Sequence, residues 1–185
     1  MGVSERSSRS QKTKRLVFCA ILCALSFVLA MLGTLMGVLD LTGVIFSGLF
    51  VALVMIEIGV NYAFMLWLVT SALLLLFLPD KLVAMEYVVC GGCYPILKNY
   101  LERIPLKPLQ WVLKFVYFNA ILTGLILLAT KVQLFMSADN ELNLEWLVYL
   151  IGNVFFIVYD LCMSVYIRYY LVILRQRLKV YKFLR

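Results

Sequence analysis

Four polar side chains that could do chemistry lie inside long apolar stretches of this sequence: Glu86, Asn119, Asn153 and Asp160. A carboxylate at the centre of a bilayer costs at least about 2.5–3.5 kcal/mol, so it usually faces a cavity or a partner. For Glu86 and Asn153 two interpretations stay open, either a ligand pocket or a structural contact such as an interhelical hydrogen bond. For Asp160 we expect a structural contact with a basic residue such as Lys114.

A second candidate for chemistry is the pair Cys90 and Cys93, which two glycines separate. In soluble redox proteins a Cys-x-x-Cys pair opens a helix, where the helix dipole lowers the pKa of the thiol. Here the pair lies inside an apolar stretch with no adjacent Lys, Arg or His, and a cysteine in such a place behaves as a small hydrophobic residue. Packing is therefore the favoured interpretation, with a membrane thiol redox enzyme as a minor alternative.

Several function classes are excluded by what the sequence lacks. The chain contains no His, which is the commonest metal ligand and the commonest general acid or base. It also lacks a Gly-rich phosphate loop and paired catalytic carboxylates. We therefore predict a protein that is not an enzyme and that has no metal site and no cofactor.

Six apolar runs must position these residues. The chain is 64% hydrophobic and 15% charged, against roughly half and a quarter in soluble domains. The core of a soluble protein of 185 residues could not bury so much apolar surface. A helix of about 20 apolar residues is long enough to cross a bilayer. We predict an all-α integral membrane protein with one six-helix transmembrane domain, residues 16–170. Its helices span residues 16–38, 42–58, 62–78, 82–97, 111–132 and 146–170.

The basic residues predict the orientation. If the N-terminus is cytoplasmic, 15 of the 17 Lys and Arg lie on the cytoplasmic side, and only Lys81 and Lys131 lie outside. The positive-inside rule therefore predicts a multi-pass cell-membrane protein with both termini in the cytoplasm. Residues 1–15 are predicted to be a disordered basic tail, and residues 171–185 a basic C-terminal segment. The net charge of +7 sits in juxtamembrane clusters, which favours membrane lipids and not nucleic acid as partners.

Small residues and helix breakers stand at informative places. The first run carries two small-xxx-small pairs, Ala20/Ala24 and Gly33/Gly37, and such spacing lets another helix approach closely. In the fourth run, the segment from Cys90 to Pro95 (CGGCYP) should bend or partly unwind the helix. The tryptophans, Trp67, Trp111 and Trp146, are predicted to lie mostly in interface belts.

The segment from Lys14 to Ser26 (KRLVFCAILCALS) resembles the first helix of the substrate-binding S components of energy-coupling factor (ECF) transporters. The likeness lies in a basic lead-in followed by an Ala-xxx-Ala face, and the predicted six-helix architecture is also similar. The outer loop at residues 39–41 is shorter than the loop that many members use as a substrate lid.

The resemblance implies that Ala20 and Ala24 dock on a transmembrane coupling subunit, which transmits ATP hydrolysis from two ATPase subunits. It also implies a vitamin-like small organic nutrient as substrate, taken up from outside into a pocket built largely from the last three helices. The residues that we predict to bind it are Glu86, Tyr87, Asn119, Trp146, Tyr149 and Asn153. A hypothesis from another class is a structural or scaffold membrane protein that binds protein partners or lipids through its basic cytoplasmic surface.

Overall fold

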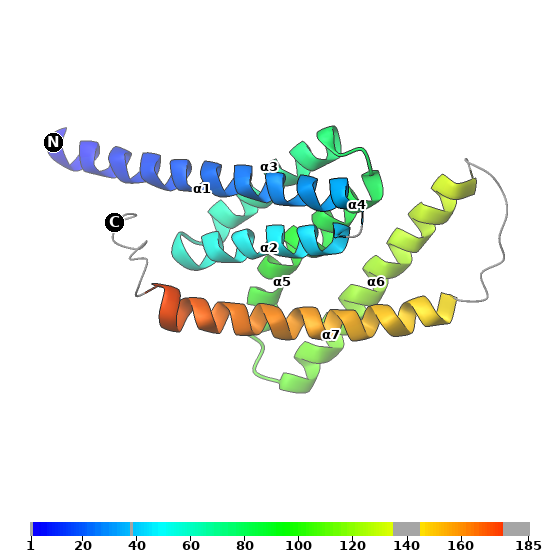
Figure 1. Cartoon of the computed structure of the whole chain (residues 1–185). Helices are drawn as coiled ribbons and strands as arrows, with labels where there is room; N and C mark the ends of the chain where they lie inside the picture. Colours follow the sequence, from blue (N-terminus) through cyan, green and yellow to red (C-terminus); the bar gives the residue numbers. More distant parts are fainter. Residues whose placement is uncertain (1, 38, 135–144, 176–185) are drawn as a thin grey trace. The chain divides into compact units, whose positions relative to one another are not determined.

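The computed structural model describes residues 2–37, 39–134 and 145–175, and all secondary structure in these ranges is helical (Figure 1). The elements are α1 (Gly2–Met36), α2 (Asp40–Glu57), α3 (Val60–Phe77), α4 (Lys81–Glu86), η1 (Tyr87–Gly92), α5 (Cys93–Leu101), α6 (Lys107–Leu134), α7 (Glu145–Tyr169) and η2 (Tyr170–Leu174), where η marks a π-helix. The predicted all-α fold is confirmed. Residues 135–144 of the predicted outer loop and residues 176–185 of the predicted C-terminal segment lie outside the described residues.

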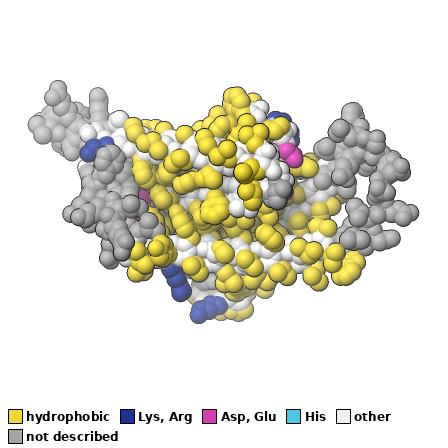
Figure 2. All heavy atoms as spheres, in the orientation of Figure 1, with side chains coloured by type: hydrophobic (Ala, Val, Ile, Leu, Met, Phe, Trp, Pro, Cys, Tyr) yellow, Lys and Arg dark blue, Asp and Glu magenta, His cyan; other side chains and the backbone are white. Residues whose placement is uncertain are grey.

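Within the described residues, five helices are long and apolar enough to cross a membrane: Ser10–Met36, Asp40–Glu57, Val60–Phe77, Lys107–Leu128 and Trp146–Ile173. Large apolar side chains are exposed on each of them, among them Leu25, Phe46, Met65, Val112 and Val158, and such side chains dominate the face seen in Figure 2. Lipid is the solvent that suits these surfaces, as expected for a membrane protein. The remaining predicted run, the fourth, is the helical stretch from α4 to α5, which η1 divides.

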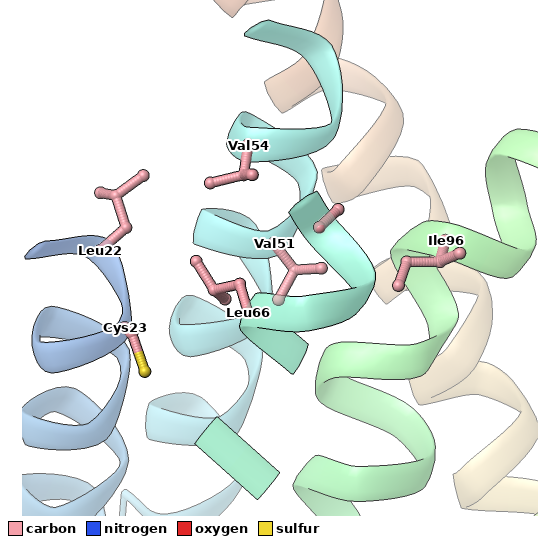
Figure 3. Close-up of a cluster of buried hydrophobic side chains, with 7 residues drawn as sticks. Leu22, Cys23, Val51, Val54, Leu66 and Ile96 are labelled. Atoms are coloured by element: carbon pink, nitrogen blue, oxygen red, sulfur yellow. The ribbon is translucent and has the colours of Figure 1, made fainter. Parts of the chain in front are cut away.

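The chain divides into two compact units, residues 1–96 with 164–185 (the first unit) and residues 97–163 (the second unit). In the first unit, α1, α2, α3 and η1 pack together. One of its core clusters contains Leu22 and Cys23 of α1, Val51 and Val54 of α2, Ala63 and Leu66 of α3, and Ile96 of α5 (Figure 3). In the second unit, α6 and α7 pack through stacked rings of Phe118 and Phe156, whose centroids are 4.5 Å apart.

Glycines bring helix backbones into direct contact in the first unit. A Cβ atom on Gly33 of α1 would lie 3.1 Å from Cα of Gly43 in α2, and one on Gly48 of α2 would lie 2.1 Å from the carbonyl oxygen of Gly91 in η1. Van der Waals packing of this kind is a main source of helix association in membranes. The predicted pairing of Gly33 with Gly37 on one packing face is wrong for Gly37, whose φ of +66° ends α1.

Helix α1 begins at Gly2, so the described backbone of residues 2–15 is helical where the sequence predicts a disordered tail. The segment after Gly2 contains no Gly or Pro, and extending an existing helix adds one hydrogen bond for each residue that is ordered. The basic segment therefore continues the turns of the apolar helix that follows it.

The fourth run stays helical across its glycines and proline, but its α-helical ladder is interrupted where the sequence predicts a bend or partial unwinding. Between α4 and α5 the chain forms the wider π-helical segment η1, a local disturbance of the i→i−4 hydrogen bonds. Pro95 lies in the first turn of α5 and has no N–H to donate to the carbonyl of Gly91. Trp67 packs on this segment, and its indole Nε1 donates a hydrogen bond of 2.9 Å to the carbonyl of Val88. Trp67 therefore has a packing role in the first unit, and its place in an interface belt stays a prediction.

Candidate functional site

Two of the predicted substrate-binding residues, Asn119 of α6 and Asn153 of α7, bind each other. Nδ2 of Asn119 donates to Oδ1 of Asn153 over 3.0 Å, and Nδ2 of Asn153 donates to Oδ1 of Asn119 over 3.1 Å. Each Nδ2 also donates to a backbone carbonyl one turn back on its own helix. Asn119 donates to the carbonyl of Phe115 over 2.9 Å, and Asn153 donates to that of Tyr149 over 2.8 Å. Both amide groups therefore use both of their N–H donors within the second unit.

A third predicted residue, Tyr149, belongs to the same network. Its hydroxyl lies 2.9 Å from Oγ1 of Thr123, which in turn is 2.8 Å from the carbonyl oxygen of Asn119. Asn119, Thr123, Tyr149 and Asn153 thus form a polar seam between α6 and α7. Of the two interpretations that the sequence leaves open for Asn153, the interhelical hydrogen bond is present in this arrangement. A ligand at the seam would have to exchange these bonds for its own.

We predict that this amide pair couples the stabilities of α6 and α7. Replacement of Asn119 or Asn153 by Leu should lower the free energy of unfolding, because each change leaves the other amide with one lost partner in an apolar setting. A double-mutant cycle with both changes should give a coupling energy of about 0.6–1.7 kcal/mol, the range for interhelical hydrogen bonds in a bilayer. Unfolding titrations in mixed detergent micelles measure it, and additive single changes would contradict the pairing.

The predicted contact between Asp160 and Lys114 is confirmed, and it forms part of a larger ion network. Nζ of Lys114 lies 3.0 Å from each carboxylate oxygen of Asp160. Nζ of Lys98 also pairs with Oδ1 of Asp160, and Oε1 of Glu102 lies 2.9 Å from Nζ of Lys98 and 3.4 Å from Nζ of Lys114. All four residues belong to the second unit, and their formal charges sum to zero.

Lys98 and Glu102 were not predicted as partners of Asp160, because both lie beyond residue 97, where the fourth helix was predicted to end. Helix α5 continues to Leu101, and Glu102 follows it with its N–H bonded to the carbonyl of Lys98 over 2.9 Å. The i, i+4 spacing of Lys98 and Glu102 is the signal that could have found this pair. In the structure, Lys98 of this pair brings a second ammonium group to Asp160.

Glu86 and Tyr87, the remaining predicted residues of the fourth run, lie in the first unit. Glu86 ends α4 and is half-buried, whereas Tyr87 begins η1 and is fully buried. The hydroxyl of Tyr87 lies close enough to the side chains of Ser47 and Thr70 to interact with them, but it makes no hydrogen bond of good geometry among the described residues. A buried hydroxyl without a partner is unfavourable by about 1–3 kcal/mol. Tyr87 therefore has hydrogen-bonding capacity that the described part of the chain leaves unused.

Other buried polar side chains near Tyr87 have polar partners of their own. Ser26 of α1 and Ser47 of α2 each donate to the backbone carbonyl of the other, over 3.2 Å and 3.0 Å. Sγ of Cys23 lies 3.3 Å from Oγ1 of Thr70. These contacts join α1, α2 and α3 by side chains that satisfy polar groups away from water.

The remaining predicted residues are placed as follows. Trp146 stands in the first turn of α7, and 66% of its surface is exposed. Ala20 and Ala24 are both exposed on α1. Cys90 in η1 and Cys93 at the start of α5 are half-buried and carry free thiols, so the redox alternative stays a prediction.

A second charged contact, which was not predicted from the sequence, ties η2 and Arg175 to α2. Oε1 of Glu57, the last residue of α2, accepts a hydrogen bond of 3.0 Å from the hydroxyl of Tyr170 and lies 3.1 Å from Nε of Arg175. The Glu57 side chain is fully buried, whereas that of Arg175 is 43% exposed. All three residues belong to the first unit, and the contact neutralises a carboxylate at a helix end.

The chain was compared with protein-family models, with curated proteins and with solved structures, and none of the three comparisons found a match.

Proposed function

We propose that this protein is the substrate-capture subunit of a membrane transporter for a small, vitamin-like organic nutrient. In this proposal it docks on a separate transmembrane coupling subunit, which connects it to ATPase subunits. The observation that carries the proposal is the exposure of Ala20 and Ala24 on α1. Two small residues at i and i+4 on an exposed apolar helix face allow the backbone of another helix to come close.

The opposite face of α1 supports this assignment. Leu22, Ser26, Ala30 and Gly33 point into the first unit, where Gly33 meets Gly43 of α2. The face with Ala20 and Ala24 carries exposed apolar neighbours instead, among them Leu16 and Val28. One side of α1 is therefore used for folding, and the other is available to a helix of a partner.

On the substrate side, Tyr87 supports the proposal. Its buried hydroxyl can donate one hydrogen bond and accept another, and neither is made within the described residues. In the proposed mechanism a polar atom of the nutrient supplies the missing partner, and Glu86 lies beside Tyr87 in the same helical stretch.

The test is native mass spectrometry of the protein purified in mild detergent from its own membrane, with quantification of co-purifying subunits. Ala20→Leu and Ala24→Leu should reduce co-purified coupling and ATPase subunits about tenfold or more, equivalent to roughly 1.4 kcal/mol of lost packing. They should leave any bound small molecule in place. Tyr87→Phe should have the reverse effect. It should lose the small molecule and keep the partner subunits, because Tyr87 does not lie on the face of α1 that carries Ala20 and Ala24.

The matched control is Leu25→Phe, which adds bulk at an exposed position one residue after Ala24, about 100° around the helix. Partner recovery should be unchanged in this variant. If Ala20→Leu and Leu25→Phe recover partners equally well, the face with Ala20 and Ala24 is not a docking site. A wild-type protein that carries neither a small molecule nor ATPase partners would remove the capture function itself.

The second candidate, a structural or scaffold membrane protein, is favoured by a different observation. The amides of Asn119 and Asn153 use their donors on each other and on their own helices, as expected for groups that hold a bundle together. In this alternative the purified protein carries phospholipid and unrelated membrane proteins. Tyr87→Phe should then change neither the co-purified lipids nor the co-purified proteins.

A further inference from the structure

The four members of the ion network around Asp160 are not equally exposed. The side chains of Lys98, Asp160 and Lys114 are 1%, 3% and 5% exposed, whereas that of Glu102 is 45% exposed. A single oxygen of Glu102, Oε1, reaches both ammonium groups. Glu102 is thus an exposed anion that covers a pair of buried cations.

The charge balance of the network depends on this exposed anion. Lys98 and Lys114 carry two positive charges, and Asp160, to which both are bonded, carries one negative charge. Without Glu102 these three buried groups would hold a net positive charge, which is strongly unfavourable away from water. The position of Glu102 Oε1 therefore favours an anion, and this anion need not belong to the protein.

The place of Glu102 in the chain indicates which external anion can reach this position. Glu102 directly follows α5, and α6 begins at Lys107, so Glu102 lies in the turn between two apolar helical segments. Such turns lie at the level of the lipid headgroups. Phosphate oxygens are concentrated there, and lysine binds phosphate as a compact point charge.

Neighbouring residues suit a whole phospholipid better than a free anion. Arg103 in the same turn and Lys107 at the start of α6 are exposed, and basic residues near the surface attract an anionic leaflet. Leu106, Trp111 and Val112 are exposed large apolar side chains close by in the sequence. Trp111 also contacts the network, since Nζ of Lys114 lies 5.4 Å from the centroid of its ring.

We infer that Lys98 and Lys114 form a binding site for the phosphate of an anionic phospholipid, and that Glu102 is an internal competitor that occupies this site when no lipid is bound. The lipid phosphate displaces the carboxylate of Glu102 toward water, accepts hydrogen bonds from both ammonium groups, and keeps the buried network neutral. Asp160 stays in place and positions both lysines. This site is independent of the proposed transport function.

The test measures lipid retention and thermal unfolding of the full chain in mild detergent, with phosphatidylglycerol or phosphatidylcholine added. Glu102→Gln removes the competitor but keeps the size of the side chain. It should unfold at a lower temperature than wild type without lipid and recover on addition of phosphatidylglycerol. It should also retain phosphatidylglycerol at a concentration about tenfold lower than wild type, the effect of roughly one charge-assisted hydrogen bond. Phosphatidylcholine should produce neither effect.

Two further variants separate the site from general attraction to the membrane. Lys98→Met leaves the pair of Lys114 and Asp160 intact, so the protein should still fold, but it should lose selective retention of phosphatidylglycerol. Lys107→Gln removes an exposed charge at the start of α6 and should change retention little. The inference is overturned if Glu102→Gln retains no more phosphatidylglycerol than wild type, or if Lys98→Met and Lys107→Gln behave alike. Stabilisation of Glu102→Gln by inorganic phosphate alone, to the same extent, would overturn a lipid as the occupant.

Discussion

Replacement of Asp160 by Ala is expected to lower the free energy of unfolding by about 3–5 kcal/mol, the largest effect of a single side chain in the second unit. Asp160 bonds to both Lys98 and Lys114. Its removal leaves two ammonium groups, 1% and 5% exposed, with the distal carboxylate of Glu102 as their shared counter-charge in the network. Unfolding in mixed detergent micelles, followed by helical circular dichroism, measures the change.

A charge-balanced variant distinguishes loss of neutrality from loss of packing. Asp160→Leu combined with Lys114→Met removes one charge of each sign and leaves Lys98 paired with Glu102, which lie 2.9 Å apart. This double variant should recover most of the stability that Asp160→Ala loses, because replacing a buried ion pair by apolar side chains of similar volume is often neutral or stabilising. Equal instability of the two variants would mean that charge balance is not what Asp160 provides.

Replacement of Gly48 by Ala is expected to destabilise the first unit by about 3 kcal/mol or more. The added Cβ would lie 2.1 Å from the carbonyl oxygen of Gly91 and 2.9 Å from its carbonyl carbon. Both are backbone atoms, so relief requires α2 and η1 to move apart and no side-chain rotation can supply it. The same unfolding titration measures the effect.

Gly124 of α6 provides the matched control. A Cβ added there meets nothing within 4 Å, so Gly124→Ala should raise the free energy of unfolding by about 0.5–1 kcal/mol through the better helix propensity of Ala. The two changes are chemically identical and should have opposite signs. If Gly48→Ala is tolerated as well as Gly124→Ala, the backbones of α2 and η1 are not in contact.

The sequence by itself determined the class of this protein and the approximate positions of its helices. Run length and apolar composition decide whether a segment can form a helix that lipid covers, and both are local properties. The contact between Asp160 and Lys114 was also predictable, because a carboxylate in an apolar helix requires a counter-charge and few basic residues lie near that depth. Exact helix limits were less accessible, since the apolar pattern that defines a run does not record how far helical hydrogen bonding continues into its polar flanks.

Only the tertiary structure decided which polar groups meet. Asn119 and Asn153 could each have faced a ligand, and their mutual hydrogen bonds follow from the rotation of α6 and α7 about their axes, which no local pattern specifies. In the sequence Glu102 has no feature that distinguishes it from other loop carboxylates. Its role follows from the position of α5, which places Lys98 beside Asp160. Likewise, Gly37 and Gly33 have the same residue type, yet one ends α1 and the other packs against α2. A polar side chain with few possible partners in the membrane can have its partner predicted from the sequence. Where several partners would serve equally well, the packing of the helices decides which one is used.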